Sequence, residues 1–401
     1  MLLLNKYRKI GALRWCERNI TLDYGQFKSA YHPLLNEPMA ALANSRGKTI
    51  GLIGSVQHIK TLTAQLWHLY SLHVEPGRAA MYDLTEAALK EFSDDKFTPL
   101  IDNTDAVLKL IPNQPYRRTK FFTSTNYGAI RLLSANVLAA RNSKTLERIS
   151  ADESWAYGDN WLDQIKDRTS SYNWSSQIFL PTSGQTKGSE LDRLWEQSSK
   201  KTWHVKCDCC DKYIPYIWRS KAIGEEIPMG GMRWASKEDY TDSDGSINFS
   251  KLAASVYYEC QLCGGKMEAN LPKQKVRNQT GKYIALNPAG DSKTDFYHYN
   301  ALAHIDWPEL VRQFKVAQID RERGVLTTLE NFVRKRLAEA WTEADYVSAD
   351  ILTIAAGGYN LNAAWDAQNQ FVFCTIDVQK DHYYYVIRGW AIVAGTLRSR
   401  L

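Results

Sequence analysis

Two adjacent carboxylates, Asp152 and Glu153, end a short apolar run that begins at Leu146. In enzymes that hydrolyse nucleoside triphosphates, a strand delivers such a pair to the edge of a sheet. There the first carboxylate helps to hold Mg²⁺ and the second polarises the attacking water. An isolated Asp-Glu pair is more often solvated surface, so its meaning depends on whether the chain also supplies a phosphate site.

A candidate phosphate-binding loop lies upstream of this pair. The run Thr-Ile-Gly-Leu-Ile-Gly predicts a buried strand, and a helical pattern follows at residues 62–72, which is the context that a phosphate loop requires. Gly54, Lys60 and Thr61 have the spacing of Gly-x-x-x-x-Gly-Lys-Ser/Thr, but Ile59 replaces the second glycine. A β-branched residue is strained there if its φ is positive, so we expect Ile59 to weaken ATP binding. The alternative is a chance strand-to-helix turn with a surface lysine.

Alternating strand and helix patterns across residues 49–185 predict a mostly parallel α/β sheet. Within it, residues 119–123 and 129–133 are expected to form a hairpin. The phosphate loop and the acidic pair would meet at the carboxyl ends of the strands, where such sheets bind ligands. Thr182 closes a strand expected beside the acidic pair, where it either senses the γ-phosphate or belongs to a plain turn.

Four cysteines form two Cys-x-x-Cys pairs, Cys207 with Cys210 and Cys260 with Cys263. Two such knuckles predict a tetrahedral thiolate site for Zn²⁺, with free thiols as the alternative. Because four thiolates leave no open position on the metal, the zinc is expected to stabilise the fold and not to catalyse. Cys209 is left outside the set. This use of cysteine indicates a reducing compartment.

The composition fits a protein of several domains with hydrophobic cores. The chain has 401 residues, of which 44% are hydrophobic and 23% charged. A net charge of +6 permits a nucleic-acid partner without requiring one. No stretch approaches the roughly 18 apolar residues of a membrane span, and the apolar start is too short for a signal peptide. We therefore expect a cytosolic protein without a membrane partner.

The last third of the chain begins with a helical pattern over residues 307–340. Residues 371–379 then predict a buried strand that carries Asp377, and residues 382–390 predict a second strand. A carboxylate on the first of two paired strands is how a nuclease sheet of the RNase H type begins. Such a site needs several carboxylates to hold two metal ions, and no acidic residue follows Asp381. The sequence therefore predicts an incomplete nuclease site, as in a truncated or split protein.

The order of these motifs resembles that of the large subunit of a lambda-type (GpA-like) tailed-phage terminase, the motor that cuts and packages viral DNA. The resemblance covers nearly the whole chain, from about residue 30 to 395. It rests on the phosphate loop at residues 54–61, Asp152-Glu153, Pro181-Thr182-Ser183, Cys207-x-x-Cys210 with the downstream Trp218, the segment from Asn331 to Trp341, and Ile376-Asp-Val-Gln379.

The resemblance implies a RecA-like ATPase core (a P-loop NTPase) with a zinc-knuckle insertion, followed by the start of an RNase H-like nuclease. It divides the chain into an N-terminal lead-in (1–45), the ATPase core (46–202), a zinc-binding element (203–290), a helical connection (291–345), a linker (346–370) and the nuclease start (371–401). It also implies a homo-oligomeric ring at the portal protein of the procapsid, a small subunit, double-stranded DNA as substrate, and action in the host cytoplasm.

By position, the resemblance also implies a role for each site residue. Lys60 would hold the β- and γ-phosphates of ATP, and Thr61 and Asp152 would hold its Mg²⁺. Glu153 would activate water and Thr182 would couple hydrolysis to movement. The remaining assignments are Gly54 and Gln57 as further nucleotide contacts and Asp377 as the first nuclease ligand for Mg²⁺ or Mn²⁺.

The expected function is ATP-driven translocation of double-stranded DNA, and two other classes of function compete with it. A degenerate relative that binds DNA or partners without hydrolysing ATP is favoured by Ile59. It is opposed by the intact pairs Lys60-Thr61 and Asp152-Glu153. A helicase-like ATPase shares the core but predicts no nuclease strand at residues 371–390.

Overall fold

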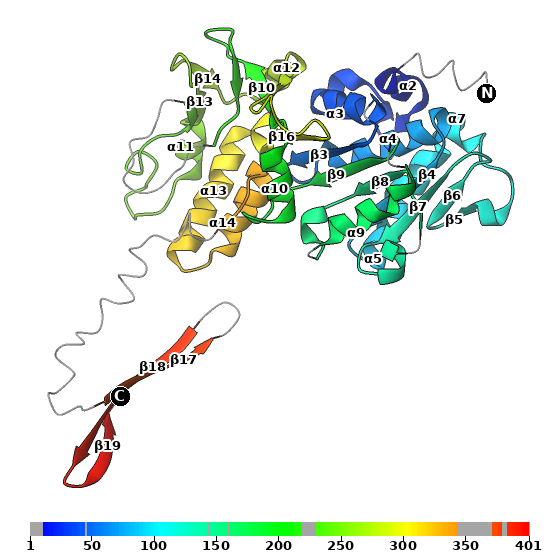
Figure 1. Ribbon diagram of the computed structural model, residues 1–401. Coiled ribbons are helices and arrows are strands. Elements are labelled where there is room, and N and C mark those ends of the chain that lie inside the picture. Colours follow the sequence, from blue (N-terminus) through cyan, green and yellow to red (C-terminus); the bar gives the residue numbers. More distant parts are fainter. Residues whose placement is uncertain are drawn as a thin grey trace. The chain divides into compact units, whose positions relative to one another are not determined.

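A large sheet and the helices on its two faces make up most of the structure, a computed structural model that describes residues 11–44, 46–142, 144–158, 160–172, 174–218, 230–342, 371–378 and 383–400. The chain divides into two compact units, Met1–Thr342 and Glu343–Leu401. Figure 1 labels their helices and strands. The linker expected at residues 346–370 lies outside the described residues.

The first unit is built on an eleven-stranded sheet with the order β11-β10-β16-β3-β9-β8-β4-β7-β6-β5, and β15 pairs with β10. The strands from β10 to β7 run parallel to one another, whereas β5, β6, β11 and β15 are antiparallel additions. Their bounds are β3 (Lys48–Gly54), β4 (Arg78–Asp83), β5 (Arg118–Thr119), β6 (Phe122–Ser124), β7 (Ala129–Ser134), β8 (Arg148–Ala151), β9 (Gln177–Thr182), β10 (Lys201–Lys206), β11 (Tyr213–Pro215), β15 (Lys282–Ala285) and β16 (Thr294–Tyr299). The predicted mostly parallel α/β sheet and the β6–β7 hairpin are confirmed.

The helices of this unit are mostly short, and α4 is central among them. Thirteen of its residues are buried, so other elements enclose it on nearly every side. The helices are α2 (Ala12–Asn19), α3 (Pro33–Asn44), α4 (Ile59–Val74), α5 (Glu86–Phe92), α6 (Thr98–Asp102), α7 (Asp105–Leu108), α8 (Leu138–Asn142), α9 (Trp161–Arg168), α10 (Glu190–Gln197), α11 (Phe249–Ala254), α12 (Leu271–Gln279), α13 (Trp307–Glu322) and α14 (Thr327–Asn331).

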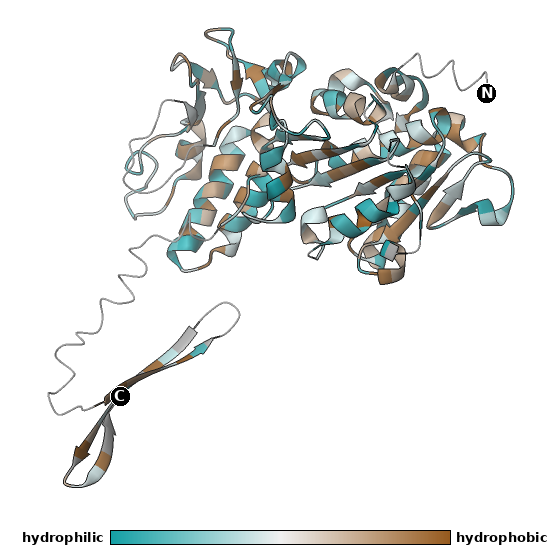
Figure 2. Cartoon of the chain, in the orientation of Figure 1, coloured by the Kyte–Doolittle hydropathy of each residue, from teal (hydrophilic) through white to brown (hydrophobic). Residues whose placement is uncertain are grey.

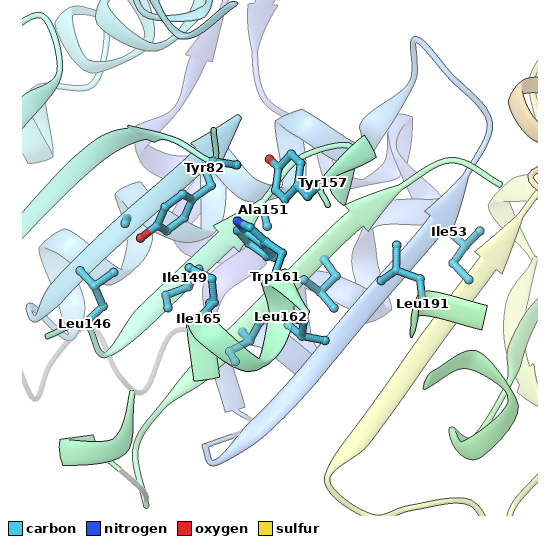
Figure 3. Packing of buried hydrophobic residues seen from close by; sticks show 14 of the residues in the cluster. Ile53, Tyr82, Leu146, Ile149, Ala151, Tyr157, Trp161, Leu162, Ile165 and Leu191 are labelled. Atoms are coloured by element: carbon cyan, nitrogen blue, oxygen red, sulfur yellow. The ribbon is translucent and has the colours of Figure 1, made fainter. Parts of the chain in front are cut away.

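Strand β9 shows how the two faces of the sheet are covered. Successive side chains of a strand point to opposite faces. The Phe179 ring lies 6.2 Å from the ring of Trp67 on α4, whereas its neighbours Ile178 and Leu180 join a buried cluster that includes Trp161 of α9. Helices α4 and α9 therefore cover opposite faces. Figure 2 shows hydrophobic residues concentrated along these strands, and Figure 3 shows the cluster on the α9 side.

The N-terminal helices belong to the same unit. Helices α2 and α3 pack against α4, and the rings of Trp15 and Tyr70 lie 5.7 Å apart. The indole of Trp15 also donates to His73 Nδ1 at 3.0 Å. The short helices predicted for residues 1–45 are present in the described part, but they complete the covering of the sheet and do not form a separate lead-in.

The segment at residues 291–345 differs from the helical connection that we expected. Its first element is β16, which pairs in parallel with β3 and β10 at the middle of the sheet. Polar residues in this strand hide its pattern in the sequence. The structure accommodates one of them, Asp295, which is paired with Lys201 at 3.2 Å and also accepts a hydrogen bond from Ser199. The helix predicted over residues 307–340 is likewise interrupted, since α13 ends before Gly324, which has a φ of +83°.

The first cysteine pair lies in the turn between β10 and β11, and the second lies in an insertion between β11 and β15. The insertion contains α11, α12 and a three-stranded sheet of β12 (Gly231–Arg233), β13 (Tyr257–Glu259) and β14 (Lys266–Glu268). The zinc-binding element expected at residues 203–290 is therefore partly wrong in extent, because β10, β11 and β15 are strands of the main sheet. These strands are too short to stand out as apolar runs.

The second unit contains an antiparallel sheet of β17 (Phe371–Val378), β18 (Tyr383–Val393) and β19 (Thr396–Arg400). The predicted pair of strands is confirmed, with Asp377 opposite Tyr384, but residues 371–377 are exposed and not buried as we expected. The third strand follows a tight turn in which Ala394 and Gly395 both have positive φ, as two-residue hairpins favour. Gln379 and Asp381 lie outside the described residues.

Candidate nucleotide site and cysteine cluster

The phosphate loop joins the end of β3 to the start of α4. The side chain of Lys60 is 4% exposed, and its ammonium donates to the carbonyls of Gly54 and Ser55 at 3.0 and 2.9 Å. A Cβ on Gly54 would lie 2.3 Å from the ring of Tyr299 on β16, so only glycine fits there. The positive φ of this loop, 56°, falls on Gln57. Ile59 is the first residue of α4 and is buried, so the strain that we expected at Ile59 does not arise.

The acidic pair follows β8 directly, at the same end of the sheet. Asp152 is half-buried, and its Oδ2 accepts a hydrogen bond from Thr61 Oγ1 at 2.6 Å. Burial and the nearby charge of Glu153 raise the pKa of the Asp152 carboxyl to about 6, against the opposing hydrogen bond from Thr61. Thr61 and Asp152 are far apart in the sequence, so the parallel sheet is what brings them into contact.

Glu153 has a left-handed backbone conformation, with a φ of 46°. Its Oε2 accepts hydrogen bonds from Trp155 Nε1 at 2.6 Å and from the Ser183 hydroxyl and amide at 2.8 and 3.2 Å. Its Oε1 lies 3.5 Å from the Lys60 ammonium. One carboxylate oxygen is thus held by the protein while the other faces the phosphate loop.

Thr182 ends β9, with Ile53 of β3 as its partner in the register. The Thr182 side chain is fully buried, and its hydroxyl has no hydrogen-bond partner among the described residues. A buried hydroxyl without a partner is unusual. Together with the Lys60 ammonium and the Thr61–Asp152 pair, it provides donors and ligands that suit the phosphates and Mg²⁺ of a nucleotide, so the residues present fit that group.

The four predicted cysteines do come together. The sulfur atoms of Cys207, Cys210, Cys260 and Cys263 all lie within 4.8 Å of one another, with distances of 3.9 Å from Cys207 to Cys263 and 4.0 Å from Cys210 to Cys260. A Zn–S bond of about 2.3 Å implies tetrahedral S···S edges of about 3.8 Å, so the spacing fits a four-thiolate site. Cys209 points elsewhere, with its sulfur 3.8 Å from the Lys266 carbonyl.

Backbone amides and one half-buried ion pair support the cysteine cluster. The amides of Cys209, Leu262 and Gly265 donate to cluster sulfurs at 3.3 to 3.4 Å, which favours thiolates. Asp208, within the first knuckle, accepts two hydrogen bonds from Arg277 of α12 at 2.8 and 2.5 Å. These contacts attach the cluster to the rest of the first unit.

Asp377 lies in the second unit on β17, and its side chain is exposed. Among residues 371–378 and 383–400 it is the sole carboxylate. A two-metal nuclease site needs several carboxylates, so the described part of this unit carries one candidate ligand.

Two family models match the chain. The phage terminase large subunit gpA, ATPase domain, matches residues 22–282, which is more than half of the chain. The chain belongs to this family. The terminase large subunit gpA, endonuclease domain, matches residues 296–393. This second match removes the helicase-like alternative, which predicted no nuclease strand, and it begins within β16 of the first unit.

Solved terminase structures resemble this chain only distantly. The Thermus phage P74-26 large terminase ATPase domain has 12% identity and a TM-score of 0.42, covering 78% of this chain and 98% of its own. The HK97 bacteriophage large terminase has 11% identity and a TM-score of 0.44, covering 97% of this chain and 66% of its own. At these scores the likeness carries no argument. No curated protein matches the chain.

The terminase site also contains residues to which the sequence assigned no role. Ser183 and Trp155 hold Glu153, and Tyr299 lies against Gly54. Ser183 and Trp155 stand next to predicted residues in the sequence, which was the one available signal. Tyr299 had no such signal, because the sequence pattern did not predict its strand. Among the described helices, none is long and apolar enough to cross a membrane.

Proposed function

We propose that this terminase chain hydrolyses ATP to translocate double-stranded DNA into a procapsid. One observation carries the proposal. Thr61 and Asp152 are joined at 2.6 Å, and Glu153 lies 3.5 Å from the Lys60 ammonium, all at one end of the sheet. These are the groups that phosphoryl transfer requires, in mutual reach.

In this proposal, Lys60 binds the β- and γ-phosphates, and Gly54 and Gln57 shape the loop around them. Thr61 and Asp152 hold the Mg²⁺ of the nucleotide, which supplies charge stabilisation when bound. The Oε1 atom of Glu153 orients the attacking water and accepts its proton, since Oε2 is already engaged by other donors.

Thr182 is proposed to couple hydrolysis to movement. Its hydroxyl is buried next to Ser183, which donates to Glu153. Loss of the γ-phosphate would therefore change the position of the end of β9 and of Glu153 together. The working assembly is proposed to be a homo-oligomeric ring at the portal protein, with a small subunit that selects DNA, in the host cytoplasm.

The remaining sites complete the proposal. Zn²⁺ bound by the four cysteines stabilises the insertion and has no open position for catalysis. In the endonuclease domain, Asp377 is proposed as one ligand for Mg²⁺ or Mn²⁺.

The test is ATP hydrolysis with and without double-stranded DNA, comparing the unchanged chain with Glu153→Gln. Glutamine keeps the size of the side chain but cannot accept the proton, so we expect turnover to fall by about a hundredfold or more while nucleotide binding persists. Glu91→Gln, on the exposed surface of α5, is the matched control and should retain activity. No turnover by the folded, unchanged chain would contradict the proposal and favour a relative that binds DNA without hydrolysing ATP.

A further inference from the structure

A short turn distant in sequence lies against the loop that carries Glu153. This turn, η7 (Phe332–Leu337), is π-helical, and Ala338 after it has a left-handed φ of 56°. A π-helical turn and a left-handed conformation at a residue other than glycine are both uncommon, and both occur frequently at functional sites. The turn carries no residue that we have placed in the nucleotide site.

Backbone contacts connect η7 to two loops of that site. The Gly184 amide donates to the Arg334 carbonyl at 2.7 Å, and the Val56 amide of the phosphate loop donates to the Lys335 carbonyl at 2.9 Å. A Cβ on Gly184 would lie 2.2 Å from the Glu339 carbonyl oxygen, so the chains touch directly. Any displacement of η7 would therefore alter its contacts with both loops.

The side chain of Arg334 makes a third connection. Its guanidinium carbon lies 4.1 Å from the centre of the Trp155 ring, and its Nε donates to the Gly184 carbonyl at 3.1 Å. Glu330, one turn earlier, accepts from the same guanidinium at 2.7 Å. The guanidinium plane is therefore fixed from several sides, and the side chain is 14% exposed. A planar, immobilised guanidinium is well suited to restrain an aromatic ring.

Trp155 transmits that restraint to the hydrolytic carboxylate. Its Nε1 donates to Glu153 Oε2 at 2.6 Å, the shortest of the three hydrogen bonds to that oxygen. While Oε2 is held in this way, Oε1 faces Lys60. If the indole rotates, the carboxylate loses the shortest of the three hydrogen bonds that hold Oε2 and leave Oε1 facing the phosphate loop.

We propose that Arg334 is a positioning residue for ATP hydrolysis: by stacking on Trp155 it orients Glu153 with Oε1 toward the nucleotide. This inference rests on the proposed function, because it assigns Arg334 an effect on the same reaction. Arg334 touches neither nucleotide nor water in this scheme. Its removal therefore lowers the rate of the chemical step and leaves nucleotide affinity unchanged.

The experiment measures kcat and KM for ATP, together with the Kd of a fluorescent ATP analogue, on the full chain. For Arg334→Ala and Trp155→Phe, which keeps a ring but lacks the N–H donor, we expect kcat to fall by about ten- to a hundredfold with KM and Kd within about twofold. Arg334→Lys should be intermediate, since it keeps the cation but not the plane. The double variant should lose no more than the worse single variant, because both act through one contact.

Arg336→Ala is the matched control. Arg336 lies on the same turn but donates to Gln313 of α13 at 2.9 Å, so its loss should leave kcat within about twofold. Melting curves identify any variant that has unfolded, and the milder Arg334→Lys then decides.

The outcomes separate the two proposals. Normal kcat in folded Arg334→Ala, losses that multiply in the double variant, or a Kd that rises as much as kcat falls would each overturn the positioning role while ATP hydrolysis stands. An unchanged chain that does not hydrolyse ATP would overturn the proposed function and this inference together.

Discussion

At the scale of single residues, burial decides which charge state each polar group prefers. Burial lowers the pKa of His58 to about 4 and that of His68 to about 3, and in both cases a nearby cation adds to the effect. For Asp152 the same cause raises the pKa to about 6. In each case the neutral form is favoured because charge is costly away from water. His68 belongs to the core, where it lies 2.9 Å from the Ser150 hydroxyl.

His68 should make stability depend on pH. Its pKa in the folded state is depressed, so the stabilisation is present above its unfolded value near 6.5 and is lost as the pH falls toward 3. Between pH 6.5 and 5 the free energy of unfolding should drop by about 2 kcal/mol from this residue alone. Denaturant unfolding of the unchanged chain and of His68→Gln at several pH values measures it. The variant should show a smaller pH dependence, and an equal dependence would contradict the assignment.

At the scale of elements, strand register and knuckle geometry place the reactive groups. Gly54 pairs with Tyr299, and Ile53 pairs with Thr182, so three neighbouring strands end at one level. The cysteine knuckle in the β10–β11 turn and the knuckle in the insertion approach each other, although they have few large apolar side chains of their own. A metal is the expected source of that stability, as in other small elements with sparse cores.

Removing one cluster cysteine should remove the metal. We expect elemental analysis to find zinc bound to the purified chain and to find none in Cys263→Ser. Cys209→Ser, whose sulfur lies outside the cluster, should retain it. Because structural zinc contributes on the order of 10 kcal/mol in isolated finger peptides, the metal-free variant should also melt earlier. Zinc retained in Cys263→Ser, or lost in Cys209→Ser, would contradict this ligand set.

At the scale of the whole molecule, the main sheet of the first unit takes one of its central strands from residues that follow the insertion in the sequence. Strand β16 is inserted between β10 and β3, and its Phe296 is fully buried with the ring against Gly51. The ATPase sheet therefore depends on residues that follow the cysteine element in the sequence. The segment after β16 also provides η7, which contacts the phosphate loop.

This topology predicts where the chain can be shortened. A fragment of residues 11–342 should fold cooperatively, because it keeps every strand of the main sheet. A fragment of residues 11–290 lacks β16 and should be insoluble or partly unfolded. Loss of Phe296 alone removes a buried ring worth about 3–5 kcal/mol. Solubility, circular dichroism and hydrogen exchange of the two fragments provide the test, and a cooperatively folded 11–290 would contradict the prediction.

The sequence by itself determined the groups whose chemistry depends on local spacing. The phosphate loop around Lys60, the Asp152-Glu153 pair and the two cysteine knuckles could be predicted because each is formed by neighbouring residues. The parallel sheet was predictable for the same reason, since strand and helix patterns alternate within short windows. Ile59 shows the limit of prediction from local spacing, because the positive φ that we considered for Ile59 occurs at Gln57.

Only the tertiary structure decided which distant residues meet at the site. Strand β16 has polar residues at several positions, and one of them, Asp295, finds partners on the neighbouring segment at Ser199 and Lys201. Ser183 donates to Glu153, and Arg334 stacks on Trp155, through contacts between separate elements. Such contacts follow from strand order and register, which a single sequence does not specify, and therefore neither the orientation of Glu153 nor the role proposed for Arg334 could be predicted from sequence.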